Sequence, residues 1–147
     1  MKTIYSTFFL FFLFLASCTE DLVQDDTSVC PAIACTEEFR TLVVKFKDAE
    51  GTLIVVKDFS AKVRRTGKFT KAGAFDTINF KGYYTIATDN DRQDLLSSGD
   101  TIDVSAVNPN TNQTKTAQFV VSGGKCACHI EKVSGPVEIV FTSNNTQ

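Results

Sequence analysis

Short runs of alternating apolar and polar residues dominate the chain after residue 40. In the first run, Leu42, Val44 and Phe46 lie on one face, and Lys45 and Lys47 lie on the other. This two-residue period is typical of a half-buried β-strand. Alternating runs, or runs rich in β-branched or apolar residues between turns, predict further strands at residues 52–59, 61–66, 82–88, 100–107, 113–122, 126–133 and 136–142. The pattern therefore predicts an all-β fold.

Turn-forming residues separate these runs. Residues 49–51 (Ala-Glu-Gly) predict a turn with glycine at a position of positive φ, and residues 108–112 (Asn-Pro-Asn-Thr-Asn) predict the tip of a hairpin. Residues 91–98 predict one short helix. Residues 68–82 lack a regular pattern and predict a long loop, with a short strand near 77–80.

Together these elements predict one domain over residues 30–142, followed by a polar tail at 143–147. We expect an antiparallel β-sandwich of about seven strands with at most one short helix. The chain has no Trp, so the tryptophan that packs on the central disulfide of immunoglobulin domains is missing. Phe46 and Phe119 fall on apolar faces and are predicted core residues, whereas Phe69 and Phe75 lie in the irregular loop.

The apolar run at residues 8–15 differs from the strands because it is unbroken and follows Lys2. It is far shorter than the ~20 residues that a helix needs to cross a bilayer, so it predicts a secretory signal peptide at residues 1–17. The run ends in Leu15-Ala16-Ser17-Cys18, which resembles the lipobox of bacterial lipoproteins. That resemblance implies cleavage before Cys18 and acylation of Cys18.

Residues 18–29 predict an acidic, flexible tether between the membrane and the domain. From residue 19 to residue 38 the chain has six acidic residues and no basic one. Glu20-Asp21 resembles the surface-export signal of Bacteroidota lipoproteins, which implies a lipid-anchored protein of the bacterial outer membrane, displayed at the surface. The body of the domain is only slightly cationic, and together with export this argues against nucleic acid as a partner.

Four cysteines remain once Cys18 is assigned to the lipid: Cys30, Cys35, Cys126 and Cys128. An even number in an exported chain predicts two disulfide bonds. Local closure of Cys126 to Cys128 is strained, so we expect each bond to join the N-terminal pair to the C-terminal pair, with two such pairings open. The alternatives are thiol redox chemistry or a zinc or copper site formed by Cys126, Cys128 and His129.

No catalytic signature accompanies His129, the only histidine. Ser122 and Ser134 flank it in sequence, but no Gly-x-Ser-x-Gly motif is present. The basic run around Arg64-Arg65 predicts a solvated face, with anionic glycans or lipid headgroups as the functional alternative. Asp-Thr-Ile at Thr77 and at Thr101 resembles the O-glycosylation acceptor of Bacteroidota. No cofactor is indicated.

The domain opens with Cys35-Thr36-Glu37-Glu38-Phe39-Arg40, continues through Gly82-Tyr83-Tyr84, and closes with Cys126-x-Cys128-His129 and Ser134-Gly135-Pro136. This arrangement resembles a family of small, uncharacterised Bacteroidota lipoproteins. Residues 41–56 also resemble the first hairpin of carboxypeptidase-regulatory and transthyretin-like sandwiches. Neither resemblance implies a catalytic set. We therefore expect a non-catalytic binding or accessory module of the cell envelope, with envelope proteins or glycans as its candidate partners.

Overall fold

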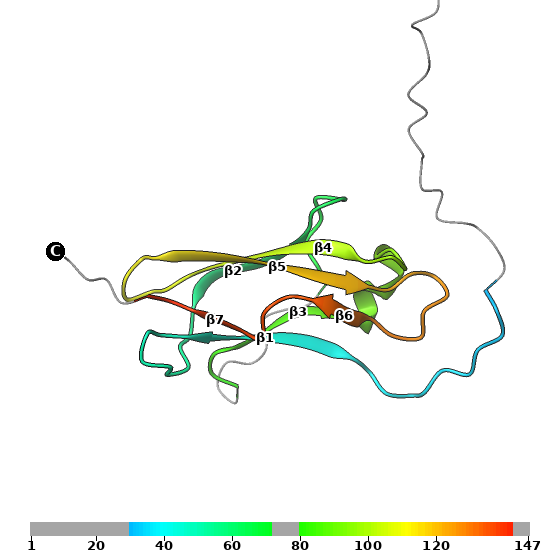
Figure 1. Ribbon diagram of the computed structural model, residues 1–147, viewed down its shortest axis with the longest axis horizontal. Helices are drawn as coiled ribbons and strands as arrows, with labels where there is room; N and C mark the ends of the chain where they lie inside the picture. Colours follow the sequence, from blue (N-terminus) through cyan, green and yellow to red (C-terminus); the bar gives the residue numbers. More distant parts are fainter. Residues whose placement is uncertain (1–29, 72–79, 143–147) are drawn as a thin grey trace, which may run out of the picture.

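The computed structural model describes residues 30–71 and 80–142, and its regular secondary structure consists almost entirely of strands in two sheets (Figure 1). The strands are β1 (Thr41–Lys47), β2 (Lys57–Val63), β3 (Tyr83–Thr88), β4 (Asp100–Val107), β5 (Thr114–Ser122), β6 (Glu131–Ser134) and β7 (Glu138–Val140). One sheet has the order β3-β1-β7 and the other the order β2-β4-β5-β6. The predicted all-β fold is confirmed.

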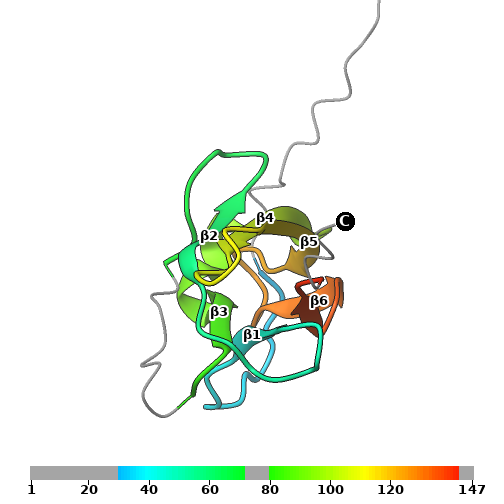
Figure 2. The ribbon, with the colours of Figure 1, turned by 90° about the vertical axis from the view of Figure 1, so that its left-hand side faces the viewer.

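The two sheets form two layers with the core between them (Figure 2). Phe46 of β1 and Phe119 of β5 are both fully buried, as their positions in the apolar pattern predict. Phe46 makes edge-to-face contacts with Tyr84 and Phe59, with ring centroids 5.3 and 6.1 Å apart. Such pairs add to the stabilisation that burial of the rings provides. Phe69 is 68% exposed, as its place in the irregular loop predicts.

The β4–β5 hairpin is the most regular part of the structure. Its pairing continues without a shift from Asp100 opposite Val121 to Val107 opposite Thr114. Residues of β4 alternate strictly between buried and half-buried, because one face of the strand meets the core and the other meets solvent. The tip lies where the sequence predicts it: the Asn108 carbonyl accepts a hydrogen bond from the Asn112 N–H, and Asn112 has a φ of 56°.

Several predicted strand boundaries are wrong. The predicted strands at 52–59 and 61–66 are one strand, β2, with a bulge at Asp58, where φ is 53°. In the part of the predicted strand that precedes β2, residues 52–56, the only strand pairing is an isolated bridge between Leu53 and Lys47. The predicted strand at 126–133 is a loop followed by the short β6.

One strand pair departs from the predicted antiparallel arrangement, because β7 pairs with β1 in parallel. The connection from β6 to β7 crosses from one sheet to the other at Gly135 and Pro136. β7 therefore does not return beside β6 as a hairpin strand would. It lies instead along the free edge of β1, with Phe46 opposite Ile139.

Within residues 30–71 and 80–142 the one helix is a 3-10 helix, η1 (Asp89–Asp94), which begins two residues before the predicted position. Thr88 caps it, and Asp91 completes a capping box by accepting a hydrogen bond from the Thr88 N–H at 2.9 Å. Asp91 also accepts a hydrogen bond from the Lys71 N–H. A strand that ends at a capping threonine thus passes directly into the helix.

Other predictions lie outside the described residues. These are the signal peptide at 1–17, the tether at 18–29 with Cys18, residues 77–79 of the predicted short strand, Phe75, Thr77 and the tail at 143–147. In the two described segments, no helix is both long and apolar enough to span a bilayer.

Gly135 provides a test of the packing. Its φ is 128°, and a Cβ there would overlap the buried ring of Phe119. We expect Gly135→Ala to lower the free energy of unfolding by about 2–5 kcal/mol, from backbone strain and overpacking together. Gly51→Ala is the matched control, because its φ is 84° but no atom lies within 4 Å; strain alone costs about 1–2 kcal/mol. Equal losses of the free energy of unfolding in Gly135→Ala and Gly51→Ala, measured by urea unfolding, would contradict this packing.

Candidate functional site at the disulfide-clamped end

Two disulfide bonds join the segment before β1 to the loop between β5 and β6. Cys30 bonds to Cys126 and Cys35 bonds to Cys128, with Cα–Cα distances of 5.2 and 5.3 Å. Of the two cross-pairings that the sequence leaves open, this is the one that the structure contains. We call the segment 30–40 together with the loop 123–130 the clamp. In Figure 1 the clamp lies at the end of the sandwich where β1 begins and β5 ends.

The loop of the clamp is fixed against η1. The N–H groups of Gly123 and Gly124 donate to the carbonyls of Leu96 and Arg92, and the Arg92 guanidinium donates to the Ala127 carbonyl. A Cβ at Gly123 would lie 2.6 Å from the Arg92 carbonyl oxygen, so only glycine allows this approach. These contacts hold the residues from Cys126 onward in a turn rather than in the predicted strand.

His129 lies at the centre of the clamp between two side chains from distant parts of the chain. Its Nδ1 is 2.8 Å from Oδ2 of Asp89, and its Nε2 is 2.9 Å from Oγ1 of Thr36. The side chains of His129 and Asp89 are only 11% and 12% exposed, whereas Thr36 is exposed. The hydroxyl beside His129 is therefore that of Thr36, rather than that of Ser122 or Ser134.

Asp89 connects the three segments that meet at the clamp. Its carboxylate accepts hydrogen bonds from the backbone N–H groups of Arg40 and Ile130, both at 2.8 Å, and contacts Nδ1 of His129. Burial by itself would raise the pKa of Asp89. The bonds from Arg40, His129 and Ile130 outweigh burial and hold the pKa below its ordinary value of 3.8. Asp89 is therefore ionised at neutral pH.

A salt-bridge network lies at the exposed rim of the clamp. The Arg40 guanidinium pairs with Glu38 at 2.9 Å and with Glu131 at 3.1 Å. Arg40 therefore links the segment before β1 to β6 through its side chain, and to η1 through its backbone N–H. Because these charged groups are largely exposed, their pairing adds little stability, and the buried contacts of Asp89 matter more.

The chemistry of the clamp follows from these contacts. All four cysteines of the clamp are bonded in pairs, and within residues 30–71 and 80–142 no group of three or more His, Cys, Asp or Glu side chains is placed to hold a metal ion. The geometry does not favour the redox or metal alternatives. A hydroxyl, an imidazole and a carboxylate lie instead in the order that hydrolases use to activate a nucleophile.

The basic run around Arg64-Arg65 is paired with acidic residues. Arg64 binds both carboxylate oxygens of Asp103 at 2.9 and 2.5 Å, and Arg65 binds both of Asp100 at 2.8 Å. Lys71 binds Asp94 at 2.6 Å. The side chains of Arg64, Arg65 and Lys71 are therefore already paired with carboxylates of this chain. This pairing favours a solvated face over a binding site for anionic ligands.

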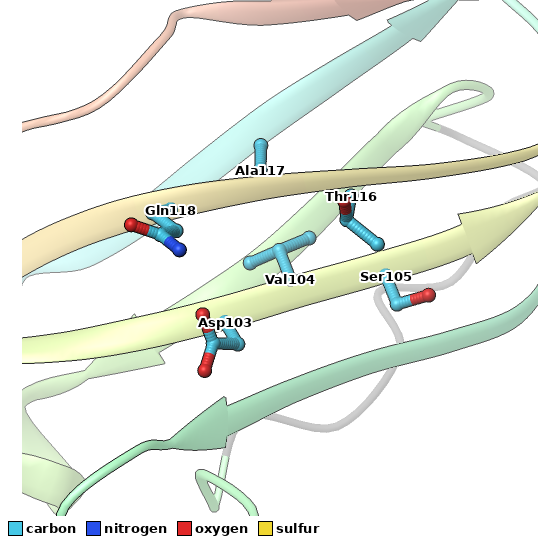
Figure 3. Close-up of a pocket in the computed structure, with 6 residues that line it drawn as sticks. All are labelled: Asp103, Val104, Ser105, Thr116, Ala117 and Gln118. Atoms are coloured by element: carbon cyan, nitrogen blue, oxygen red, sulfur yellow. The ribbon is translucent and has the colours of Figure 1, made fainter.

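A shallow depression lies on the outer face of β4 and β5 (Figure 3). Its volume is about 580 Å³, and its polar lining comes from Asp103, Ser105, Thr116 and Gln118. Thr101, one of the two predicted glycosylation acceptors, lies two residues before Asp103 on the same strand and opposite Val120. The face offers hydroxyl and amide groups, which suit a polar ligand.

Comparison of the chain with models of protein families, with curated proteins and with solved structures finds no match.

Two residues of the candidate site, Thr36 in the clamp and Asp89 in η1, are not predicted from the sequence. Thr36 is 93 residues from His129 and Asp89 is 40 residues from it. One signal was available: Thr36 and His129 each directly follow a cysteine, so the correct disulfide pairing places them side by side. Asp89 had no such signal, because it follows a predicted strand as an ordinary turn residue.

The two disulfides close nearly the same large loop, with sequence separations of 96 and 93 residues, so their contributions to stability are not additive. With one bond present, the other closes only a small ring of residues 30–35 and 126–128, and chain entropy makes it worth about 2–3 kcal/mol. Removing both bonds releases the large loop as well, for a loss of about 7 kcal/mol. We expect Cys30→Ser with Cys126→Ser, and separately Cys35→Ser with Cys128→Ser, to cost the smaller amount in urea unfolding. If the four-serine variant lost no more free energy of unfolding than a variant that lacks one disulfide, the shared large loop would be contradicted.

Asp89 makes the clamp sensitive to acid. Because its pKa is lower in the folded protein than the ordinary 3.8, its contribution to stability is complete above pH 3.8 and is lost as pH falls through the folded pKa. We expect Asp89→Asn to lower the free energy of unfolding at pH 7 by about 1–3 kcal/mol and to flatten its fall below pH 4. Asp103→Asn is the control, because that carboxylate is exposed; an equal loss there would contradict the role of Asp89.

Proposed function

We propose that the protein is a lipid-anchored, non-catalytic binding or accessory module of the bacterial outer membrane. The observation that carries the proposal is the lipobox-like Leu15-Ala16-Ser17-Cys18, followed by an acidic segment that leads to Cys30. Acylation of Cys18 holds the domain at the membrane, and the acidic segment separates the two. The likeness of Glu20-Asp21 to a surface-export signal supports display at the cell surface.

The clamp supports this proposal because an anchored domain needs a secure attachment of its N-terminal segment. Residues 31–39 are all exposed, so burial contributes little to holding them. The Cys30–Cys126 bond joins the first described residue directly to the loop before β6. Disulfide bonds persist in the envelope, where they give small exported domains the stability that a modest core does not supply.

The outer face of β4 and β5 is the surface on which we place the ligand. Its depression is lined by the hydroxyl and amide groups of Ser105, Thr116 and Gln118, which bind the hydroxyls of glycans or the backbone of an envelope protein through hydrogen bonds. The competing function is redox or metal chemistry at Cys126, Cys128 and His129. It is less well supported, because it needs free thiols.

The anchor is tested by substitution of the acylated residue. We expect Cys18→Ala to remove the mass of the acyl chains and to move the protein from the membrane fraction to the soluble fraction. Stable anchoring needs more than one chain, since a single acyl chain binds a bilayer only marginally. Ser17→Ala is the matched control, because it keeps a small residue before Cys18. Equal masses and equal detergent partitioning of Cys18→Ala and the parent would contradict the proposal.

A second measurement separates the binding module from the redox or metal alternative. Thiols of the purified protein are titrated in denaturant without reductant, and zinc and copper are measured on the native protein. The proposal expects no free thiol among Cys30, Cys35, Cys126 and Cys128, and no stoichiometric metal. Four free thiols with one bound metal ion would establish the alternative.

A further inference from the structure

We propose that Thr36 carries an activated hydroxyl that accepts an acyl group from carboxylic esters, with His129 as its base and Asp89 as the residue that orients the imidazole. The inference goes beyond the proposed binding function. It does not require turnover, because the acylated threonine is itself the product.

The distances fit a nucleophile, a base and an orienting carboxylate. Oγ1 of Thr36 lies 2.9 Å from Nε2 of His129, and Nδ1 lies 2.8 Å from Oδ2 of Asp89. Both fall within the range of about 2.6–3.2 Å that proton transfer between such groups needs. The three residues come from the segment before β1, from the loop before β6 and from η1, so only the folded chain assembles them.

The hydrogen bonds of Asp89 determine which nitrogen of His129 is the base. Asp89 accepts from two backbone N–H groups, those of Arg40 and Ile130, and an ionised carboxylate has no proton to donate. Nδ1 of the neutral imidazole must therefore carry the proton that this contact needs. Nε2 is then left with a lone pair that faces Thr36, and the Thr36 hydroxyl donates to it.

Asp89 and His129 are largely buried and Thr36 is exposed, as the proposed reaction requires. The side chains of Asp89 and His129 are 12% and 11% exposed, which limits competition from water for their contact. Thr36 is exposed, so an ester can reach it. The Cys35–Cys128 bond lies directly before Thr36 in one segment of the clamp and directly before His129 in the other, and it keeps the hydroxyl beside the imidazole.

The reaction is a single acyl transfer. Oγ1 of Thr36 attacks the ester carbonyl carbon while its proton passes to Nε2 of His129. The bond between the carbonyl carbon and the leaving oxygen then breaks, and Nε2 returns the proton to that oxygen. The products are an ester of Thr36 and a free alcohol, and His129 is neutral again. Asp89 stabilises the imidazolium that forms between the two proton transfers.

The experiment uses an alkyl fluorophosphonate as the first probe, with 4-nitrophenyl acetate as the second, on the folded protein with its disulfides intact. Attack on phosphorus releases fluoride and leaves a stable adduct. We expect one adduct per chain, mapped by tandem mass spectrometry to Thr36, and one acetyl group at the same residue. Heat-denatured protein should not react.

Variants then assign the roles. Thr36→Val should abolish labelling, and His129→Gln should slow it by about 100-fold or more, the usual contribution of a general base. Thr52→Val is the matched control, because Thr52 is also exposed but has no histidine beside it; it should label like the parent. Cys35→Ser with Cys128→Ser should also slow labelling, with the circular-dichroism spectrum showing that the sandwich persists.

Three results would overturn the proposal: no adduct on the native parent, an adduct mapped to another residue, or equal labelling of Thr36→Val and the parent. The first two need no variant, so a failure of His129→Gln to fold would not remove the test.

Discussion

The covalent connection between residues 30–40 and the loop 123–130 is the constraint on which this end of the molecule depends. Residues 31–39 are exposed throughout, and they belong to neither sheet. Even the apolar side chains of Ile33 and Phe39 are 52% and 59% exposed. Neither burial nor strand pairing therefore holds this segment in place. The two disulfides hold it instead, and they bring Thr36 within hydrogen-bonding distance of His129.

The strands could be predicted where one face of a strand is buried and the other is solvated. β4 has this character along its whole length, and its boundaries matched the alternation of the sequence. Prediction failed where a local turn or a covalent bond overrides the pattern. The sequence predicts a strand at residues 126–133, but the contacts of the glycines with η1 and the two disulfides form a loop at residues 126–130. The parallel pairing of β7 depends on where the chain crosses between sheets, which alternation does not encode.

The candidate site was predictable only in part, for a similar reason. The cysteines and His129 are conspicuous in the sequence, because cysteine number and spacing carry information about disulfides. Thr36 and Asp89 are ordinary residue types, and their roles arise only when the folded chain brings three distant segments together. The basic run shows the converse: Arg64 and Arg65 stand out in the sequence, but each is held by a carboxylate of β4. Ion pairs in the folded chain thus neutralise a basic run that is evident in the sequence, whereas tertiary contacts assemble a site that is not evident there.

The pairing of the four cysteines is the central claim, and tryptic digestion without reduction tests it most directly. Arg40 ends the peptide that contains Cys30 and Cys35, and cleavage after Lys125 and Lys132 releases the peptide that contains Cys126 and Cys128. The disulfide pairing of the structure predicts a single species in which both peptides are joined by two bonds. Partial reduction with differential alkylation should then assign Cys30 to Cys126 and Cys35 to Cys128. Two separate peptides, each closed internally or carrying free thiols, would contradict the clamp.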